Sequence, residues 1–545
     1  MIFIPTLLIS MFITIALIPI FKGLAVRANV MDIPNDRKVH AYPMPKCGGI
    51  AMALGVLASI FFWVPTTEFV SAVLIGSGII VLFGLIDDVI NLEWKIKFSG
   101  QCAAALVVIL YGGVKIKCLG MLLPDNVFLP DWFAIPFTLI AIVGVTNAIN
   151  LSDGLDGLAG GISLLSFICI GCLAYCSANI VIALLSIAVV GAILGFLRFN
   201  TYPAVLFMGD AGSQLLGFLA VTFSLALTQG NTSFTPLLPL ILLGFPVLDT
   251  LTVMFERVVG GRSPFVADKN HFHHKLIRLG LYHTEAVLVI YILQAFLVTF
   301  AFVFRFHPEW FLLIFYIIFS TGILSGFFVA KKRGWKFKRY DFVDKIIKGR
   351  LRILKEKNIL IKVFSRLVEV GVPSLLLFTC FLPTNMPIYF SFFSMALLGL
   401  LLVTLCIKKE WLGTVLRLIL YPLIPIVIYW GEADMVAWMN DKLVVPYNFS
   451  FGFLFLFVIL TLKFTRRRNG FKSTPMDFLI LFIALVVPNF PDKQIQSYHM
   501  GLMAAKIIVF FFSYEVLIGE LRVDLNRLGL TTILALVVIS VKGIL

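Results

Sequence analysis

Long apolar stretches recur along the whole chain and are separated by short polar segments. Each stretch runs for roughly 17 to 25 residues, the length of α-helix that crosses about 30 Å of hydrocarbon. A backbone surrounded by lipid must satisfy its own hydrogen bonds, so these stretches are expected to be helical. The pattern predicts an all-α, polytopic membrane protein with about eighteen transmembrane helices.

The longest polar stretch of the chain divides these helices into about eleven before it and about seven after it. The first set is expected near residues 3–26, 48–65, 69–86, 99–113, 133–150, 158–176, 179–197, 213–229, 235–256, 284–304 and 310–330. The second set is expected near 364–383, 386–406, 412–430, 448–464, 475–489, 500–519 and 528–545. We therefore divide the chain into a first module at 1–330, a basic cytoplasmic linker at 331–363 and a C-terminal module at 364–545.

Composition and charge identify the bilayer as the main solvent of this protein. Hydrophobic residues make up 60% of the 545 residues, charged residues make up 13%, and the mean hydropathy is +1.01. The formal net charge is +15, and the Lys and Arg clusters fall on the cytoplasmic side when the amino terminus is placed outside. This placement indicates a multi-pass membrane protein and no nucleic-acid partner. The eight cysteines lie mostly inside apolar stretches and are expected to be buried, unpaired side chains.

Carboxylate and carboxamide residues gather at the ends of the predicted spans, all on the cytoplasmic side. A charged side chain at the bilayer centre costs at least about 2.5 to 3.5 kcal/mol, which favours span ends but does not favour one side. A purely structural role would scatter these residues over both sides. They are Asp87 and Asp88 at the third span, Asn147, Asn150, Asp153 and Asp156 at the fifth, Asp210 before the eighth, and Asp249 near the end of the ninth.

Two glycine-containing segments predict a site for phosphate and a divalent cation. The segment 147–159 places Asp153 and Asp156 three residues apart, on nearly one face if it is helical. The segment 207–213 carries Asp210. Carboxylate and amide oxygens suit Mg²⁺, and glycine lets a phosphate approach the backbone closely. Either segment alone could instead be a helix start, because Asp and Ser are good N-caps.

An acidic pair and a basic loop add to the same face. Asp87 and Asp88 are adjacent and repel each other, so a metal, a base role or a lysine partner is expected to satisfy them. The basic loop at 32–49 is suited to a pyrophosphate or a lipid phosphate, although an ordinary positive-inside loop would look similar. Its cationic or titratable residues are Arg37, Lys38, His40 and Lys46.

A histidine cluster follows the ninth predicted span. Arg262 opens this segment, and His271, His273 and His274 close it. Three clustered histidines could form a zinc site, but no Cys and no HExxH spacing accompany them. We therefore expect substrate binding or acid–base chemistry from this segment rather than zinc binding.

Taken in order, these motifs resemble the polyprenyl-phosphate N-acetylhexosamine-1-phosphate transferases of glycosyltransferase family 4. The motifs are DxPNxRKxH with PxPxxGG, the DD pair, NxxNxxDGxDGLAGG, FMGDxGS, PxxD and GRSPFxxDxxHxHH. The resemblance covers about residues 1–330 and is closest to the bacterial undecaprenyl-phosphate N-acetylglucosamine-1-phosphate transferases that begin O-antigen and related envelope glycans. Lys46 departs from the family's usual residue at its position.

The resemblance implies an eleven-helix catalytic module in the bacterial inner membrane, with a cytoplasmic active site. It implies Mg²⁺, or alternatively Mn²⁺, as cofactor, a UDP-N-acetylhexosamine donor, undecaprenyl phosphate as acceptor and UMP as leaving group. Direct attack by the lipid phosphate and a covalent aspartyl intermediate both stay open at this point.

The resemblance also implies roles for individual residues. The metal ligands would be Asn150 and Asp210. The carboxylates that bind or activate the lipid phosphate would be Asp87 and Asp88, and those that orient the donor or the metal's waters would be Asp153 and Asp156. The substrate-binding residues would be Arg37, Lys38, His40, Lys46, Asn147, Arg262, His271, His273 and His274.

Two other classes of function fit part of the sequence. A secondary transporter would also have many spans, but transporters place their charged sites near the bilayer midplane. A scaffold with an inactive transferase module is disfavoured by the intact acidic motifs. The C-terminal module shows no catalytic motif, and its role stays open between homodimerisation or assembly with partners in envelope-glycan synthesis, regulation of the transferase, and a further activity. Lys506 and Glu515 fall in one of its spans, and we expect them to snorkel to opposite interfaces.

Overall fold

The structure, a computed structural model, describes residues 3–33, 43–124, 127–230, 232–263, 270–335, 359–384, 386–407, 412–433, 439, 441–464, 500–519 and 525–542. These residues confirm an all-α, polytopic fold, with a small antiparallel pair of strands, β1 (Met31–Asp32) and β2 (Met44–Pro45). They form two compact units, one containing the described residues up to 335 and the other those from 359 onward.

The first unit contains a helix at each span predicted for the first module. Among the described residues, nine helices, α15 of the second unit included, are long and apolar enough to cross a membrane. The helices of the first unit are α1 (Phe3–Arg27), α2 (Gly48–Trp63), α3 (Glu68–Ile90), α4 (Trp94–Leu110), α5 (Asp131–Leu151), α6 (Leu158–Cys176), α7 (Ile180–Asn200), α8 (Gly209–Thr228), α9 (Leu238–Leu242), α10 (Gly244–Val259), α11 (Phe272–Arg278), α12 (His283–Val303) and α13 (Glu309–Lys332).

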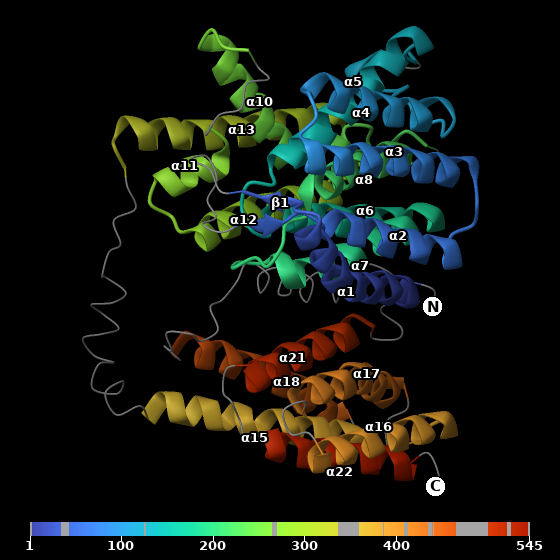
Figure 1. The fold of residues 1–545 in the computed structure, drawn as a ribbon, viewed down its shortest axis with the longest axis vertical. Coiled ribbons are helices and arrows are strands. Elements are labelled where there is room, and N and C mark those ends of the chain that lie inside the picture. Colours follow the sequence, from blue (N-terminus) through green and yellow to red (C-terminus); the bar gives the residue numbers. More distant parts are fainter. Residues whose placement is uncertain are drawn as a thin grey trace. The chain divides into compact units, whose positions relative to one another are not determined.

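Helix α8 is the most buried of these spans and packs against α2, α3, α5 and α6. Its small residues allow close helix crossings, as is usual in membranes. A Cβ atom at Gly217 would lie 2.7 Å from the Cα atom of Thr146 on α5. Besides this group of helices around α8, helices α1, α2 and α7 lie side by side and form a second group (Figure 1). The core of the first unit therefore holds α8 tightly against the helices that carry the predicted acidic residues.

The ninth predicted span, 235–256, is not one continuous helix. It is divided into α9 and α10, and Leu243 between them has a non-helical backbone. Pro246 lacks the N–H group that would donate to the Leu242 carbonyl within a continuous helix. That carbonyl instead accepts hydrogen bonds from Ser166 and Gln294. The proline and these two side chains explain the break.

Two other local expectations also need correction. The segment expected to be a histidine loop contains a short helix, α11, which begins directly after His271. Helix α3 continues to Ile90, so Asp87 and Asp88 lie inside its last turns rather than after its end.

The second unit is a helical bundle around an apolar core. The predicted span at 475–489 and most of the predicted linker at 331–363 lie outside the described residues. The described helices of this unit are α15 (Ile359–Phe381), α16 (Ile388–Ile407), α17 (Leu412–Ala433), α18 (Asp441–Phe464), α21 (Met500–Gly519) and α22 (Leu525–Lys542).

Lys506 of α21 does not snorkel to an interface, so that expectation was wrong. Its side chain is 1% exposed, and its ammonium group forms an ion pair with Glu432 at the end of α17. The same ammonium group lies 4.2 Å from the ring centroid of Tyr447 and 5.4 Å from that of Phe451 on α18. A carboxylate and two aromatic faces thus replace the solvation that snorkelling would provide. The side chain of Glu515 lies outside the described residues.

Candidate active site

An acidic cavity of about 280 Å³ lies at one end of the first unit. The carboxyl-terminal ends of α3 and α5 and the amino-terminal ends of α6 and α8 meet there, beside the β1–β2 pair. We call this space the acidic cavity. Its lining residues are Asp32, Lys46, Asp88, Asn150, Asp153, Gly154, Leu155, Asp156, Asn200, Phe207, Gly209, Asp210, Ser213, His274 and His283.

Asp88 of α3 caps the amino terminus of α8. Its Oδ1 accepts a hydrogen bond from the backbone N–H of Asp210 (3.0 Å), and its Oδ2 accepts one from Ala211 (3.2 Å). Gly209 makes this approach possible, because its φ is +73° and a Cβ atom there would lie 2.9 Å from the carboxyl carbon of Asp88. The helix start is therefore shaped to receive a carboxylate from another helix.

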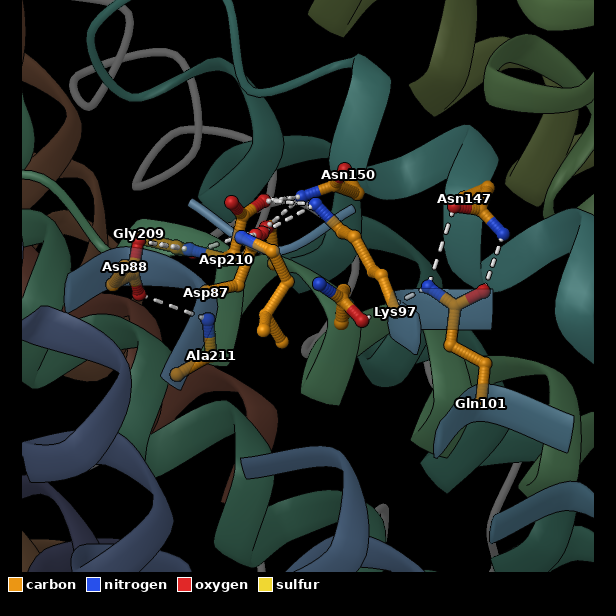
Figure 2. Close-up of polar contacts among 12 residues, drawn as sticks. Asp87, Asp88, Lys97, Gln101, Asn147, Asn150, Gly209, Asp210 and Ala211 are labelled. Atoms are coloured by element: carbon orange, nitrogen blue, oxygen red, sulfur yellow. Dashed lines mark hydrogen bonds and ion pairs between the residues drawn. The ribbon is translucent and has the colours of Figure 1, made fainter. Parts of the chain in front are cut away.

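Lys97 in the first turns of α4 links two of the carboxylates (Figure 2). Its Nζ lies 2.8 Å from Oδ2 of Asp87 and 3.1 Å from Oδ1 of Asp210. The amide group of Asn150 donates to the same Oδ1 of Asp210 (2.5 Å) and to the hydroxyl of Ser213 (2.8 Å). Asp210 is thus the point at which α4, α5 and α8 meet.

Lys46 reaches the cavity from the segment after β2. Its Nζ lies 3.5 Å from Asp88 Oδ1 and 3.6 Å from Asp32 Oδ1. The backbone positions it, because the N–H of Phe207 donates to the carbonyl of Pro45 (2.9 Å). Burial alone would lower the pKa of Lys46, but the carboxylates of Asp88 and Asp32 raise it above the ordinary lysine value. Lys46 is therefore a permanent cation beside the acidic groups.

Asp153 and Asp156 lie between α5 and α6 and line the cavity. Asp156 Oδ2 accepts a hydrogen bond from the backbone N–H of Ala204 (3.0 Å). Burial, followed by the negative charge of Asp210 and then of Asp88, raises the pKa of Asp153 to about 8. Burial and the two neighbouring carboxylates thus both favour the neutral form of the Asp153 carboxyl group.

The helix-cap interpretation of the two glycine-containing segments was wrong. The residues in the N-cap positions are Gly157 for α6 and Met208 for α8, and neither makes a side-chain cap. Asp153 and Asp156 therefore do not cap α6, the helix that follows them, and the start of α8 at Asp210 is capped by Asp88 of α3. The carboxylates of Asp153, Asp156 and Asp210 face the cavity instead.

The three histidines of the predicted cluster have different surroundings. Asp249 of α10 holds the cluster, because its Oδ2 lies 2.9 Å from His271 Nδ1 and its Oδ1 accepts from the N–H of Phe272 (2.7 Å). His273 packs against Gly154, and burial, with a further contribution from the other histidines, lowers its pKa well below the ordinary value. His274 lines the acidic cavity.

The rings of His271 and His273 are stacked, and the ring of His274 is tilted against that of His273. The centroid distances are 5.8 Å from His271 to His273 and 4.2 Å from His273 to His274. Within the part of the chain that the structure describes, no three His, Cys, Asp or Glu side chains are arranged to hold a metal by themselves.

The structure brings together many of the residues that the sequence singled out. Those that line the acidic cavity are Lys46, Asp88, Asn150, Asp153, Asp156, Asp210 and His274. Asp87 lies next to it through Lys97. Asn147 bonds to Gln101 rather than lining the cavity, and Arg262 is exposed after α10. The predicted substrate-binding residues Arg37, Lys38 and His40 lie outside the described residues.

Sequence reasoning missed several residues of the site. Lys97 was not singled out among the cytoplasmic Lys and Arg residues, although its place in the first turns of the helix after the acidic pair was a usable signal. Ser213 lies one turn after Asp210, which also could have been noticed. Asp32 opens the DxPNxRKxH motif, which was also a usable signal, whereas nothing in the local sequence pointed to the other missed residues of the lining, Asn200 and His283.

Comparison with known proteins places this arrangement in a family. Residues 70–228 match the model of glycosyl transferase family 4. The "Probable undecaprenyl-phosphate N-acetylglucosaminyl 1-phosphate transferase" of Bacillus subtilis (strain 168) is 36% identical over 288 residues, which are 52% of this chain and 80% of that protein.

Two enterobacterial proteins are also similar, and both carry the name "Undecaprenyl-phosphate alpha-N-acetylglucosaminyl 1-phosphate transferase". The one from Escherichia coli (strain K12) is 31% identical over 357 residues, 63% of this chain and 95% of that protein. The one from Salmonella typhimurium (strain LT2) is 32% identical over 365 residues, 64% of this chain and 96% of that protein. These matches confirm the resemblance read from the motifs, and the chain belongs to glycosyl transferase family 4.

Proposed function

We propose that this protein transfers N-acetylhexosamine 1-phosphate, and specifically N-acetylglucosamine 1-phosphate, from a UDP-sugar to undecaprenyl phosphate. The observation that carries the proposal is the acidic cavity, where Lys46 pairs with Asp88 and the amide of Asn150 binds Asp210, and where Lys97 pairs with Asp210 next to the lining. The named activity of the relatives supports the same reaction. The products would be a lipid-linked pyrophosphoryl sugar and UMP.

In the proposed reaction, a phosphate oxygen of the lipid attacks the β-phosphorus of the UDP-sugar. The bond from that phosphorus to the oxygen bridging the two donor phosphates breaks, and UMP leaves with the electron pair. Such a transfer requires mainly positioning and charge neutralisation. Lys46 and Lys97 lie where they can neutralise phosphate oxygens, and His274 lies where it can contact the donor.

The residues of the cavity fit a bound Mg²⁺ ion, with Mn²⁺ as a substitute. Asp210 and Asn150 offer hard oxygen donors, and the pKa of Asp153, raised by burial and by the charges of Asp210 and Asp88, supports a cation beside these carboxylates. Mg²⁺ usually takes one or two protein carboxylates and completes its shell with water and substrate phosphates. When bound, it would neutralise phosphate charge. Asn150 would have to turn its amide oxygen toward the ion.

We propose direct attack rather than an aspartyl intermediate. Both oxygens of Asp88 already accept backbone hydrogen bonds, and Asp87 accepts from Leu92 N–H (2.8 Å) while its other oxygen binds Lys97. These carboxylates are held as organising groups and are poorly placed to attack phosphorus. Accumulation of a phosphorylated aspartate when UDP-N-acetylglucosamine is supplied without the lipid would overturn this part of the proposal.

The cellular setting follows from charge and family. We propose that the acidic cavity opens at the cytoplasmic face of the bacterial inner membrane, supported by the Lys and Arg residues of the neighbouring segments. The product would then begin an O-antigen or related envelope glycan. Homodimerisation or a glycan-assembly partner is the role we propose for the second unit.

The test is UMP release by the purified full chain with Mg²⁺, undecaprenyl phosphate and a panel of UDP-sugars. We expect release with UDP-N-acetylglucosamine and its loss in Asp210→Asn. A matched control is Asp131→Asn, an exposed aspartate on the other end of α5 that pairs with Lys115, and this variant should stay active. A lack of UMP release with every UDP-N-acetylhexosamine tested would contradict the assignment and favour a transporter or a scaffold.

A further inference from the structure

Two tiers of polar side chains connect α4, α5 and α8, and Figure 2 labels all their members except Gln214. The upper tier, Lys97, Asn150 and Asp210, borders the acidic cavity and meets at Oδ1 of Asp210. One helical turn further from that end, the same three helices contribute Gln101, Asn147 and Gln214. The two polar residues of each helix are four residues apart on α4, three on α5 and four on α8, so each helix presents both of its residues on one face. We call the second set the amide tier.

The amide tier is a continuous set of hydrogen bonds. Gln101 Nε2 donates to Gln214 Oε1 (2.9 Å) and to Asn147 Oδ1 (3.3 Å), and Asn147 Nδ2 donates back to Gln101 Oε1 (2.6 Å). Gln101 is 2% exposed and Gln214 is 1% exposed. Gln101, Asn147 and Gln214 are not among the residues that line the acidic cavity. They are therefore placed to act on the cavity only through the helices that carry them.

The amide tier is a costly way to join helices that small and apolar residues could join. Polar groups buried in an apolar interior lower stability unless they are hydrogen-bonded. Within the described part of the protein, Gln214 Nε2 has no hydrogen-bond partner, so this cost is only partly offset. What directional hydrogen bonds provide, and apolar contacts do not, is one defined register between helices.

We infer that the amide tier sets the register of α4 and α5 on α8, and thereby holds Lys97 and Asn150 on Asp210. Gln101 is its central positioning residue, because it bonds to both other members. The inference rests on the proposed function for its catalytic consequence. Loss of the tier allows α4 and α5 to shift, which moves the two groups that surround the Asp210 carboxylate.

Gln294 offers a matched control in the same unit. It is fully buried on α12, and its Nε2 donates to the hydroxyl of Ser166 (2.9 Å) and to the carbonyl of Leu242 (2.7 Å). It also joins three helices, and like Gln214 it has one polar atom without a partner among the described residues. Its bonds connect α6, α9 and α12 and include no member of the upper tier. Replacing it removes a comparable network away from the cavity.

The experiment compares Gln101→Met with Gln294→Met in the full chain. A misplacement of about 1 Å at a reacting centre costs up to about 100-fold in rate, so Gln101→Met should lower kcat by roughly 10- to 100-fold. The KM for UDP-N-acetylglucosamine should change less than about twofold, because no donor contact is removed. Gln294→Met should lower the Tm to a similar degree while kcat stays within about twofold of the wild type.

Hydrogen exchange at residues 205–216 provides a readout that needs no substrate. Exchange there should rise in Gln101→Met and stay unchanged in Gln294→Met, even if the substrate assignment is wrong and no UMP is released. If Gln101→Met does not fold, Gln214→Met takes its place, because it removes only the Gln101–Gln214 bond of the tier. Hydrogen exchange and kcat should then change in the same directions. Unchanged exchange and kcat in the tier variant would overturn the inference. So would an equal loss of kcat in both variants at equal Tm.

Discussion

The ammonium group of Lys97 lies 3.1 Å from Oδ1 of Asp210, while it also lies 2.8 Å from Oδ2 of Asp87. One cation therefore joins carboxylates from α3 and α8, two helices that the sequence separates by more than a hundred residues. The same oxygen of Asp210 accepts from Asn150. A divalent ion at Asp210 would compete with Lys97 for this oxygen and leave the ammonium group available to a substrate phosphate.

Lys97→Met is expected to lower UMP release by about 100-fold or more, the usual cost of removing one preorganised donor from a charged transition state. Lys95→Met is the control, because Lys95 lies on the same helix, is exposed, and its ammonium group lies 5.8 Å from the centroid of the Trp94 ring. Steady-state rates at saturating Mg²⁺ measure both. A Lys97→Met enzyme with wild-type kcat would contradict the role given to this ammonium group.

The Asp153 carboxyl predicts a pH dependence of cation binding. Its pKa of about 8 lies above the ordinary value, so the group is neutral at pH 7 and becomes charged as the pH rises through about 8. The Mg²⁺ concentration at half-maximal rate should therefore fall between pH 7 and pH 9, and binding should release protons. In Asp153→Asn this pH dependence should disappear. A half-saturating concentration that is independent of pH in the wild type would contradict the prediction.

The same shift predicts an effect on stability. Because the pKa of Asp153 is raised in the folded state, the folded protein holds this proton in a range where the unfolded chain has lost it. Stability should therefore fall as the pH rises from about 4 to about 8 and then level off. Without added cation, Asp153→Asn should have a higher Tm than the wild type at pH 9 and a similar Tm at pH 4. A lower Tm at pH 9 would show that the carboxylate is favourably paired.

Much of the fold and part of the site could be predicted from the sequence, because the membrane restricts the choices. The lengths of the apolar stretches alone predicted the spans. Assigning the charged residues to one side of the membrane predicted that Asp88, Asp153 and Asp210 lie together, and all three line the acidic cavity. What could not be predicted depends on contacts between distant helices. The break before Gly244 required Gln294 and Ser166 to satisfy a free carbonyl.

Asn147 and Lys506 show the same limit. The resemblance implied a substrate contact for Asn147, and the sequence did not indicate that the buried amide of Gln101 on α4 binds it. Lys506 was expected to snorkel because its partner Glu432 lies on another helix, 74 residues earlier. Local pattern identifies a polar residue in a span, but only the packed bundle identifies its partner.

Asp249 and Glu256 both tie α10 to α11, one in the interior and one at the surface. The buried carboxylate of Asp249 binds His271 and the N–H of Phe272, whereas Glu256 pairs with Lys275 at 2.7 Å in an exposed position. Asp249→Ala leaves a buried donor unsatisfied, which costs about 1 to 3 kcal/mol, while an exposed pair is worth about 0 to 1 kcal/mol.

We therefore expect Asp249→Ala to raise the KM for UDP-N-acetylglucosamine several-fold, because α11 carries His274 to the cavity. Glu256→Ala should leave KM near the wild-type value, and Asp249→Asn, which keeps one acceptor oxygen, should fall between them. Initial-rate measurements over a range of donor concentrations distinguish the three. Equal KM values in all of them would mean that α11 does not depend on the Asp249 contact.

The Lys506–Glu432 ion pair of the second unit predicts strong coupling between two substitutions. Lys506→Met leaves the Glu432 carboxylate buried and unpaired, and breaking a buried pair in this way costs about 3 to 5 kcal/mol. The double variant Lys506→Met with Glu432→Gln removes both charges and should recover much of that loss. Thermal unfolding of the full chain in one detergent, measured for the wild type, both single variants and the double variant, completes this double-mutant cycle.

Lys542 supplies the control for this cycle, since its ammonium group binds the carbonyls of Phe381 and Pro383 rather than a carboxylate. Lys542→Met and Glu432→Gln should therefore have additive effects, within about 0.5 kcal/mol. Coupling of the Lys506 and Glu432 substitutions well above that value would establish the pair as the reason a lysine is tolerated inside the apolar core. Additive effects there as well would mean that the rings of Tyr447 and Phe451 stabilise the ammonium group without help from the carboxylate.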